Sequence, residues 1–183
     1  MWKVFLTFSL IFVTIILWFL SYYWFFTPVQ IFVVETGWEY VVYEEMKWSY
    51  NNSSNITNKI YYSLLNEDKI ETFKGFWIFY DNPKNVKEED LRSDVWSILE
   101  QKDWGKIPDL ELKYKVKQIP RWTYVIAEYP IRWNLSYVLG VFKIYPALEK
   151  FSKENKLDNN VSITEIYDIP NEKIIYRQEF IQP

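Results

Sequence analysis

The side chains that could do chemistry in this chain are carboxylates, tyrosines and lysines, because the sequence contains no cysteine and no histidine. Their absence excludes disulfides, a thiolate nucleophile, a histidine base and any zinc site built from Cys or His. Any acid–base step would use Asp, Glu, Tyr or Lys. Aromatic residues make up 21% of the chain, so many of them must either pack in a core or line a site.

The length and charge of the chain narrow the class of protein. A chain of 183 residues suggests one domain with an appendage. The net charge of −3 disfavours a nucleic-acid partner, because such partners are bound through an excess of Lys and Arg. The sequence suggests no cofactor and no metal ion.

The N-terminal segment predicts a membrane helix. Residues 4–26 carry no charge, and a helix of that length spans about 34 Å, enough for a hydrocarbon core of about 30 Å. Trp2 lies at one end and residues 22–24 are aromatic at the other, as in interfacial belts. We therefore expect an anchor over residues 1–27 that places residues 4–26 in the lipid bilayer. The alternative, a cleaved signal peptide, lacks a cleavage site of small residues.

The charges around this segment suggest an orientation. Lys3 precedes the apolar run, and the next cation is Lys47. Acidic residues intervene at Glu35, Glu39, Glu44 and Glu45. The positive-inside rule then predicts a single-pass membrane protein with its domain on the extracytoplasmic side.

The remainder, residues 28–183, shows one order of elements twice. In repeat one, residues 29–102, alternation predicts one long strand or two strands broken near Gly37. A helical pattern follows, and then two strands. These later elements are expected at residues 58–70, 73–81 and 94–101.

Repeat two, residues 110–183, has the same order. A strand pair bent at Pro120 is expected first, then a helix over residues 134–157 that Pro146 should kink or divide. Strands are expected at residues 161–170 and 172–181, joined by a turn. The predicted apolar face of the helix consists of Leu135, Val138, Leu139, Phe142, Leu148 and Phe151.

Two such units can form one antiparallel sheet with helices on one face, which is an α+β fold. Within it, "YDNP" at residues 80–83 should turn the chain out of the sheet, and "VWSIL" at residues 95–99 should return as a strand. Trp96–Leu99 also matches the loose aromatic-x-x-aliphatic pattern of adaptor ligands, but a buried strand would hide it. Sequons stand at Asn51, Asn52, Asn55, Asn134 and Asn160.

Several stretches resemble a known family. "IPRWTYVIAEYP", "YPALEKFSKENKL" and "TEIYD" are similar to the GyrI-like domain, a small-molecule-binding fold of effector modules. "YDNP", "LRSDVWSIL", "YPAL" and "EIY" are similar to the membrane-anchored branch of that family, and they occur in the same order. The resemblance covers residues 29–183. It implies a cleft between the repeats, lined by aromatics and one inward carboxylate.

The resemblance assigns that carboxylate to Glu165, and an acid among aromatic walls favours flat or cationic organic ligands. Tyr167 lies two residues on and shares its side of the sheet. The alternatives are an exposed strand Glu and aromatics that belong to the core. Arg92 and Asp94 are expected on the surface, or else at the mouth of the pocket. The candidate ligand-binding residues are Glu165, Tyr167, Trp77, Tyr80, Trp122 and Tyr124.

Three functions remain open at this point. The first is a membrane-anchored, non-catalytic module that binds a cationic or aromatic small molecule. The second is a membrane-tethered adaptor for an unknown membrane protein, with a cleft filled by its own Trp and Tyr and an exposed apolar patch elsewhere. The third, implied by the wider family, is a hydrolase in which Glu165 activates water with Tyr167 or Tyr124 as donor.

Overall fold

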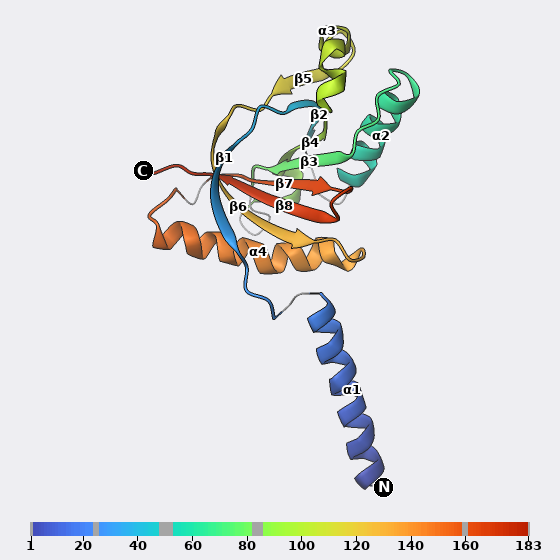
Figure 1. Ribbon diagram of the computed structural model, residues 1–183, viewed down its shortest axis with the longest axis vertical. Coiled ribbons are helices and arrows are strands. Elements are labelled where there is room, and N and C mark those ends of the chain that lie inside the picture. Colours follow the sequence, from blue (N-terminus) through green and yellow to red (C-terminus); the bar gives the residue numbers. More distant parts are fainter. Residues whose placement is uncertain (1, 24–25, 48–52, 82–85, 159–160, 183) are drawn as a thin grey trace.

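The computed structural model describes residues 2–23, 26–47, 53–81, 86–158 and 161–182, and for residues 53 and 54 the backbone alone. Helix α1 (Trp2–Tyr22) projects from the rest of the molecule, as Figure 1 shows, and none of its residues is buried. In the described part of the chain it is the one helix long and apolar enough to cross a membrane. This confirms the helix predicted over the N-terminal segment, although it does not show a membrane.

In the domain that follows, the described residues form eight strands, two long helices and three short helical turns. The strands are β1 (Ile31–Thr36), β2 (Tyr40–Lys47), β3 (Lys74–Phe79), β4 (Arg92–Ile98), β5 (Lys115–Gln118), β6 (Trp122–Pro130), β7 (Ile163–Asp168) and β8 (Lys173–Glu179). The helices are α2 (Ser53–Asn66), η2 (Glu88–Asp90), η3 (Gln101–Lys106), α3 (Ile107–Leu110) and α4 (Leu135–Glu154). The three short ones, η2, η3 and α3, were not predicted.

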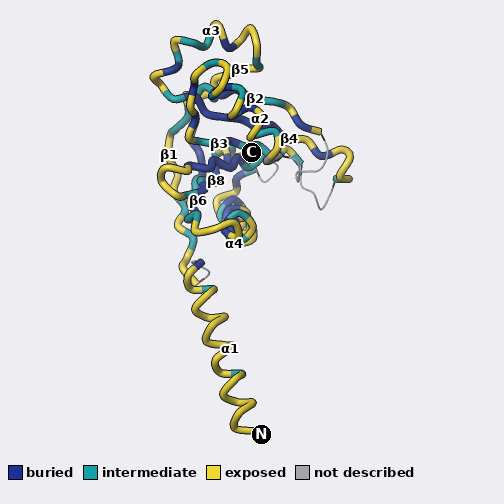
Figure 2. Tube along the Cα trace, turned by 90° about the vertical axis from the view of Figure 1, so that its right-hand side faces the viewer, coloured by how far each residue is buried: buried dark blue, intermediate teal, exposed yellow. Residues whose placement is uncertain are grey.

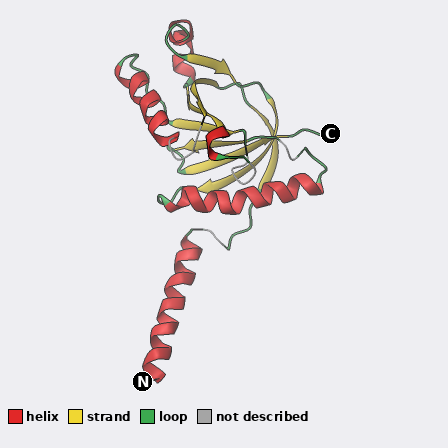
Figure 3. Ribbon diagram, turned by 180° about the vertical axis from the view of Figure 1, so that it is seen from behind, coloured by secondary structure: helices red, strands yellow, loops and turns green. Residues whose placement is uncertain are grey.

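All strands belong to one antiparallel sheet in the order β1-β6-β8-β7-β3-β4-β2-β5. Helices α2 and α4 both pack on the same face of it (Figure 3). The predicted α+β class is therefore confirmed. The order strand–helix–strand–strand occurs twice, as β2-α2-β3-β4 and β6-α4-β7-β8. The predicted domain and repeat boundaries remain a prediction.

Two long, bent strands pair along both of their halves. Thr36 in β1 is opposite Trp122 in β6, and Tyr40 in β2 is opposite Gln118 in β5, so the register continues unbroken across the gap. Within the gap, Ile119 accepts a hydrogen bond from the Trp38 N–H and donates one to the Glu39 carbonyl, each 2.8 Å long. Because β1 and β5 are opposite edges of the sheet, this shared ladder makes the sheet curl back on itself.

The bends lie where the sequence predicts them. Gly37 has φ of +128°, and a Cβ there would stand 2.2 Å from the Pro120 carbonyl oxygen. The strand therefore breaks at Gly37, and the partner bends at Pro120. One expectation was wrong: the strands on either side of Pro120 do not pair with each other, since β5 pairs with β2 and β6 pairs with β1 and β8. Residues 119–121, between β5 and β6, do not form a reverse turn, so the chain keeps its general direction from β5 into β6.

The predicted apolar face of α4 is only partly correct. Leu148 is buried and Leu139 and Phe151 are half-buried, whereas Leu135, Val138 and Phe142 are exposed. The residues of α4 that are buried against the sheet form a regular stripe of Ser136, Gly140, Ile144, Leu148 and Ser152.

Large aromatic side chains on the sheet explain this stripe of small residues. A Cβ on Gly140 would lie 2.3 Å from the Tyr176 hydroxyl and 3.3 Å from the Tyr129 ring. Because the large side chains at this contact belong to the sheet, the helix can pack against it only where its own side chains are small. The helix also continues through Pro146 as one element instead of dividing there. Pro146 is exposed, so the carbonyl that loses its donor can be solvated by water.

The opposite face of the sheet holds a core of its own inside the curl. Its buried residues are Val41, Phe76, Trp96, Ile98, Ile119 and Ile166. Two cations lie over aromatic rings there: the Lys117 ammonium is 3.8 Å from the centre of the Trp96 ring, and the Arg177 guanidinium is 5.2 Å from that of Phe76. Because Trp96, Ile98 and Leu99 are at most 6% exposed, the adaptor-ligand pattern at residues 96–99 is hidden.

The close approach at Gly37 yields a stability prediction. We expect Gly37→Ala to lower the free energy of unfolding by about 1–3 kcal/mol from the strained φ alone, with a further loss from the clash with Pro120. Thermal or urea unfolding of the full chain in detergent would measure it. Gly105→Ala is the matched control, because a Cβ there meets nothing within 4 Å. Equal stability of the two variants would contradict the close approach of Gly37 to Pro120.

Candidate functional site

Glu165 is a buried acid at the centre of the helix-covered face. It lies on β7 with 2% of its surface exposed. Across the ladder it is opposite Trp77 on β3 and Tyr176 on β8. Both carboxylate oxygens accept hydrogen bonds from tyrosines: Tyr145 of α4 donates to Oε1 at 2.9 Å, and Tyr167 of β7 donates to Oε2. The prediction that Glu165 points inward, and not into solvent, agrees with this geometry.

Aromatic rings surround this carboxylate. The centroids of the Trp77 and Tyr167 rings are 4.7 Å apart, and those of Tyr145 and Tyr176 are 6.0 Å apart. Trp77 also donates from Nε1 to the hydroxyl of Thr57 at 2.9 Å, which ties the wall to α2. We call the set formed by Glu165, Trp77, Tyr145, Tyr167 and Tyr176 the Glu165 box.

Opposing effects set the electrostatics of the Glu165 box. Burial raises the pKa of Glu165 above its ordinary value, and the hydrogen bonds from Tyr167 and Tyr145 oppose that rise. Within the described residues no Lys or Arg forms an ion pair with it. Burial and the neighbouring carboxylate likewise raise the pKa of Tyr167. The Tyr176 hydroxyl is buried and, among the described residues, has no hydrogen-bond partner.

A positive group beside Glu165 would stabilise the carboxylate, and the faces of Trp77 and the tyrosines would attract the same charge. Within the described part of the chain, no group of acidic residues is arranged to hold a metal ion. In the described structure the carboxyl group of Glu165 is enclosed by aromatic side chains of the chain itself.

The structure brings three of the six predicted site residues together and separates the others. Glu165, Tyr167 and Trp77 meet in the Glu165 box. Tyr80, Trp122 and Tyr124 do not reach it, because alternation along their strands turns them to the opposite face. Tyr80 donates to Asp94 at 2.7 Å, Trp122 is half exposed, and the Tyr124 ring lies 4.6 Å from the Arg177 guanidinium.

Tyr80, Arg92 and Asp94 border a hollow of about 330 Å³ on that opposite face, which we call the Asp94 hollow. Asp94 is 5% exposed and lies 3.3 Å from the Lys117 ammonium. Arg92 is exposed and pairs with Asp81 at 2.8 Å. Arg92 and Asp94 thus border a hollow, but it is the Asp94 hollow and not the site of Glu165.

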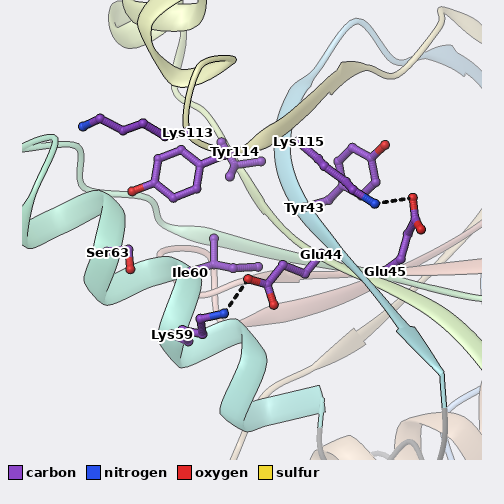
Figure 4. A pocket seen from close by; sticks show the side chains of 10 residues that line it. Tyr43, Glu44, Glu45, Lys59, Ile60, Ser63, Lys113, Tyr114 and Lys115 are labelled. Atoms are coloured by element: carbon purple, nitrogen blue, oxygen red, sulfur yellow. Dashed lines mark hydrogen bonds and ion pairs between the residues drawn. The ribbon is translucent and has the colours of Figure 1, made fainter.

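A second hollow of about 490 Å³ lies between α2, β2 and β5, and Figure 4 shows its lining. Ion pairs line it: Lys59 with Glu44 at 2.7 Å and Lys115 with Glu45 at 2.8 Å. Neither of these two hollows is lined by Glu165, which is enclosed by its own aromatic neighbours.

Two members of the Glu165 box, Tyr145 and Tyr176, were missed by sequence reasoning. A signal for Tyr176 was present: once the turn pairs Asp168 with Lys173, the antiparallel register places Tyr176 opposite Glu165. The odd spacing between Trp77 and Tyr80 also excludes a shared face in a regular strand. Tyr145 had no such signal, because its position depends on how closely α4 approaches the sheet.

The fold combines a curled antiparallel sheet, two helices on one face of it, and a buried acid beneath those helices. No protein-family model matches the chain. The crystal structure of the EcmrR C-terminal domain is similar over 86% of this chain and 100% of that one, with a TM-score of 0.60 and 14% identity. A cryo-EM structure of an EcmrR–DNA complex is similar over 85% and 58%, with a TM-score of 0.61 and 15% identity. These likenesses show the fold.

Two curated proteins are similar in sequence. The chain is 33% identical over 86 residues to the testis-expressed protein 264 homolog of Mus musculus and, equally, to testis-expressed protein 264 of Homo sapiens. Each match covers 44% of this chain and 28% of the relative. The chain therefore matches little more than a quarter of the length of those proteins.

The raised pKa of Glu165 predicts a pH dependence of stability. Its contribution is fully present below the ordinary Glu pKa of about 4.3 and is lost as the pH rises through the raised pKa of the folded chain. Glu165→Gln cannot ionise, so we expect this variant to lose less stability than the wild type over that rise. Thermal midpoints measured at a series of pH values would show it, with the exposed Glu111→Gln as control. Parallel profiles for Glu165→Gln and wild type would contradict a raised pKa at Glu165.

Proposed function

We propose that this chain is a membrane-anchored ligand-binding module of the GyrI-like, effector-binding type, and that it binds a cationic aromatic small molecule at Glu165. The observation that carries the proposal is the Glu165 box: a carboxylate 2% exposed, enclosed by Trp and Tyr, with no ion-pair partner in the described residues. A buried acid is costly, and a ligand cation is one way to offset that cost.

The fold and the motifs support the same proposal. The likeness to the EcmrR C-terminal domain covers 86% of this chain. Two of the stretches similar to the GyrI-like domain contain residues of the Glu165 box: Tyr145 in "YPALEKFSKENKL" on α4, and Glu165 and Tyr167 in "TEIYD" on β7. Helix α1 supplies the anchor, since its length and apolar character are those of a membrane span.

A ligand would have to displace side chains to reach Glu165. Trp77 on β3 and Tyr137 and Tyr145 on α4 are half-buried, and they separate the carboxylate from solvent. The Tyr137 ring lies 5.4 Å from that of Tyr167, so it forms the outer layer of the same wall. Binding would then exchange the two tyrosine hydrogen bonds on Glu165 for contact with the cation.

Ligand binding can be tested by a shift in the thermal midpoint. We expect a panel of cationic aromatic compounds, beginning with benzyltrimethylammonium, to contain a compound that stabilises the full chain in detergent. A ligand at a hundredfold excess over its dissociation constant adds about 2.7 kcal/mol. The shift should disappear in Glu165→Gln, because the charge that attracts the cation is gone.

Glu111→Gln is the matched control for this experiment. It removes the same charge from an exposed position at the end of α3, so it should keep the full shift. A shift that survives in Glu165→Gln would place the ligand elsewhere, and the Asp94 hollow would be examined next. No shift with any compound would count against the module as a small-molecule binder.

A second function, a membrane-tethered adaptor, is favoured by one specific observation. The space around Glu165 is filled by the aromatics of the chain itself, while large apolar side chains are exposed elsewhere, including Trp133 and Phe142. The hydrolase alternative has less support. Tyr124 faces away from Glu165, and both oxygens of the acid already accept hydrogen bonds from tyrosines.

The sidedness expected from Lys3 can be tested with introduced cysteines, because the chain has none of its own. We expect Leu112→Cys, 85% exposed on the domain, to react with a membrane-impermeant maleimide in intact cells. Trp2→Cys, at the other end of α1, should react only after permeabilisation. The reverse pattern would place the domain in the cytoplasm.

A further inference from the structure

The N-terminal half of α4 and Trp133, two residues before it, present large apolar side chains to solvent. Phe142 is 75% exposed, Trp133 71%, Val138 50% and Leu135 38%. Leu135, Val138 and Phe142 recur at helical spacing on the side of α4 turned away from the buried stripe at Ser136 and Gly140. We call the four exposed residues the α4 apolar face. Exposed apolar surface of this kind marks a binding surface.

This face lies beside the end of α1. The Arg132 guanidinium, just before α4, is 5.3 Å from the centre of the Tyr22 ring. Tyr129 of β6 donates a hydrogen bond to the backbone carbonyl of Tyr23, which is itself 2% exposed. The last turn of the apolar helix is thus attached to the domain at the place where α4 begins.

The arrangement of the two helices matters as much as their proximity. In Figures 1 and 2, which differ by a quarter turn, α4 is the element of the domain nearest to α1, and Figure 1 shows it running across the direction of α1. A bilayer that surrounds α1 has its surface across that direction. Helix α4 would then lie along the surface, with the sheet behind it.

The composition of this segment fits the interfacial region of a bilayer. Residues 131–148 contain no Asp or Glu, and their cations are Arg132 and Lys143. Tryptophan and arginine are favoured where hydrocarbon meets headgroups. Apart from Lys143, the charged residues of α4 lie in its C-terminal half, at Glu149, Lys150, Lys153 and Glu154.

We infer that the α4 apolar face inserts into the interfacial layer of the same membrane that α1 spans, so that the domain is held at two points and lies with α4 flat on the lipid. This rests on the anchoring part of the proposed function and extends it. The occupant is lipid, because the α4 apolar face follows Arg132, which contacts the end of α1, and residues 4–22 of α1 carry no charge.

Depth measurements on single cysteines test this inference. The full chain would carry a nitroxide spin label at Phe142→Cys or Val138→Cys, both exposed positions, and would be reconstituted into phosphatidylcholine vesicles. Collision with oxygen reports lipid, and collision with a nickel chelate reports water. We expect the ratio of oxygen to nickel accessibility at both sites to be several-fold higher than at Leu112→Cys, which is 85% exposed on the domain.

A label at Phe12→Cys, within α1, separates the inference from the anchor. Phe12 in lipid with both α4 labels in water would overturn the inference while leaving the anchor intact. Phe12 in water would overturn both. Low accessibility to oxygen and nickel alike at Phe142 would mean that protein covers the face, which also overturns a lipid occupant. As a second variant, Phe142→Asp should return a label at Val138 to water, while an unchanged depth would contradict insertion.

Discussion

The constraint on which this structure depends is the continuous pairing of two bent strands. The ladder between β1 and β6 and the ladder between β2 and β5 share one register, and they meet where Gly37 touches Pro120. Because β1 and β5 are the two edge strands of the eight-stranded sheet, the contact between Gly37 and Pro120 brings the two edges together and closes the curl. The inner core around Trp96 is buried by that closure alone, because α2 and α4 lie on the other face.

The curl encloses one face of the sheet, and helices α2 and α4 cover the other, outer face. Glu165 lies on that outer face, beneath the helices. Strands β3, β7 and β8 run side by side in the middle of the sheet, so Trp77, Glu165 and Tyr176 form a row across it. Helix α4 then covers part of the row and contributes Tyr145. The acid is thus buried by aromatic side chains from both layers, with Trp77, Tyr167 and Tyr176 from the sheet and Tyr145 from α4.

Much of this architecture could be predicted from residue patterns, and the failures have physical causes. Alternation and helical spacing identified the strands, the two long helices and the break at Gly37. The face of α4 could not be predicted, because apolar spacing assumes that a helix buries its large residues. Here Gly140 and Ser136 face large aromatics, and Phe142 is left outside. The place of Tyr145 likewise depends on tertiary packing, which no local pattern records, whereas the antiparallel register was a signal for Tyr176.

Helix α4 also acts as a mechanical link. A helix of 20 residues is a stiff rod about 30 Å long. Near its middle, Tyr145 touches the buried acid, and just before its first turn Arg132 touches the end of α1. A tilt of this helix would therefore change the contact with Glu165 in the domain interior and the contact with the end of α1 together. Glu165 and the end of α1, which are far apart in the sequence, thus contact the same helix or the residues just before it, so any displacement of α4 would change both contacts.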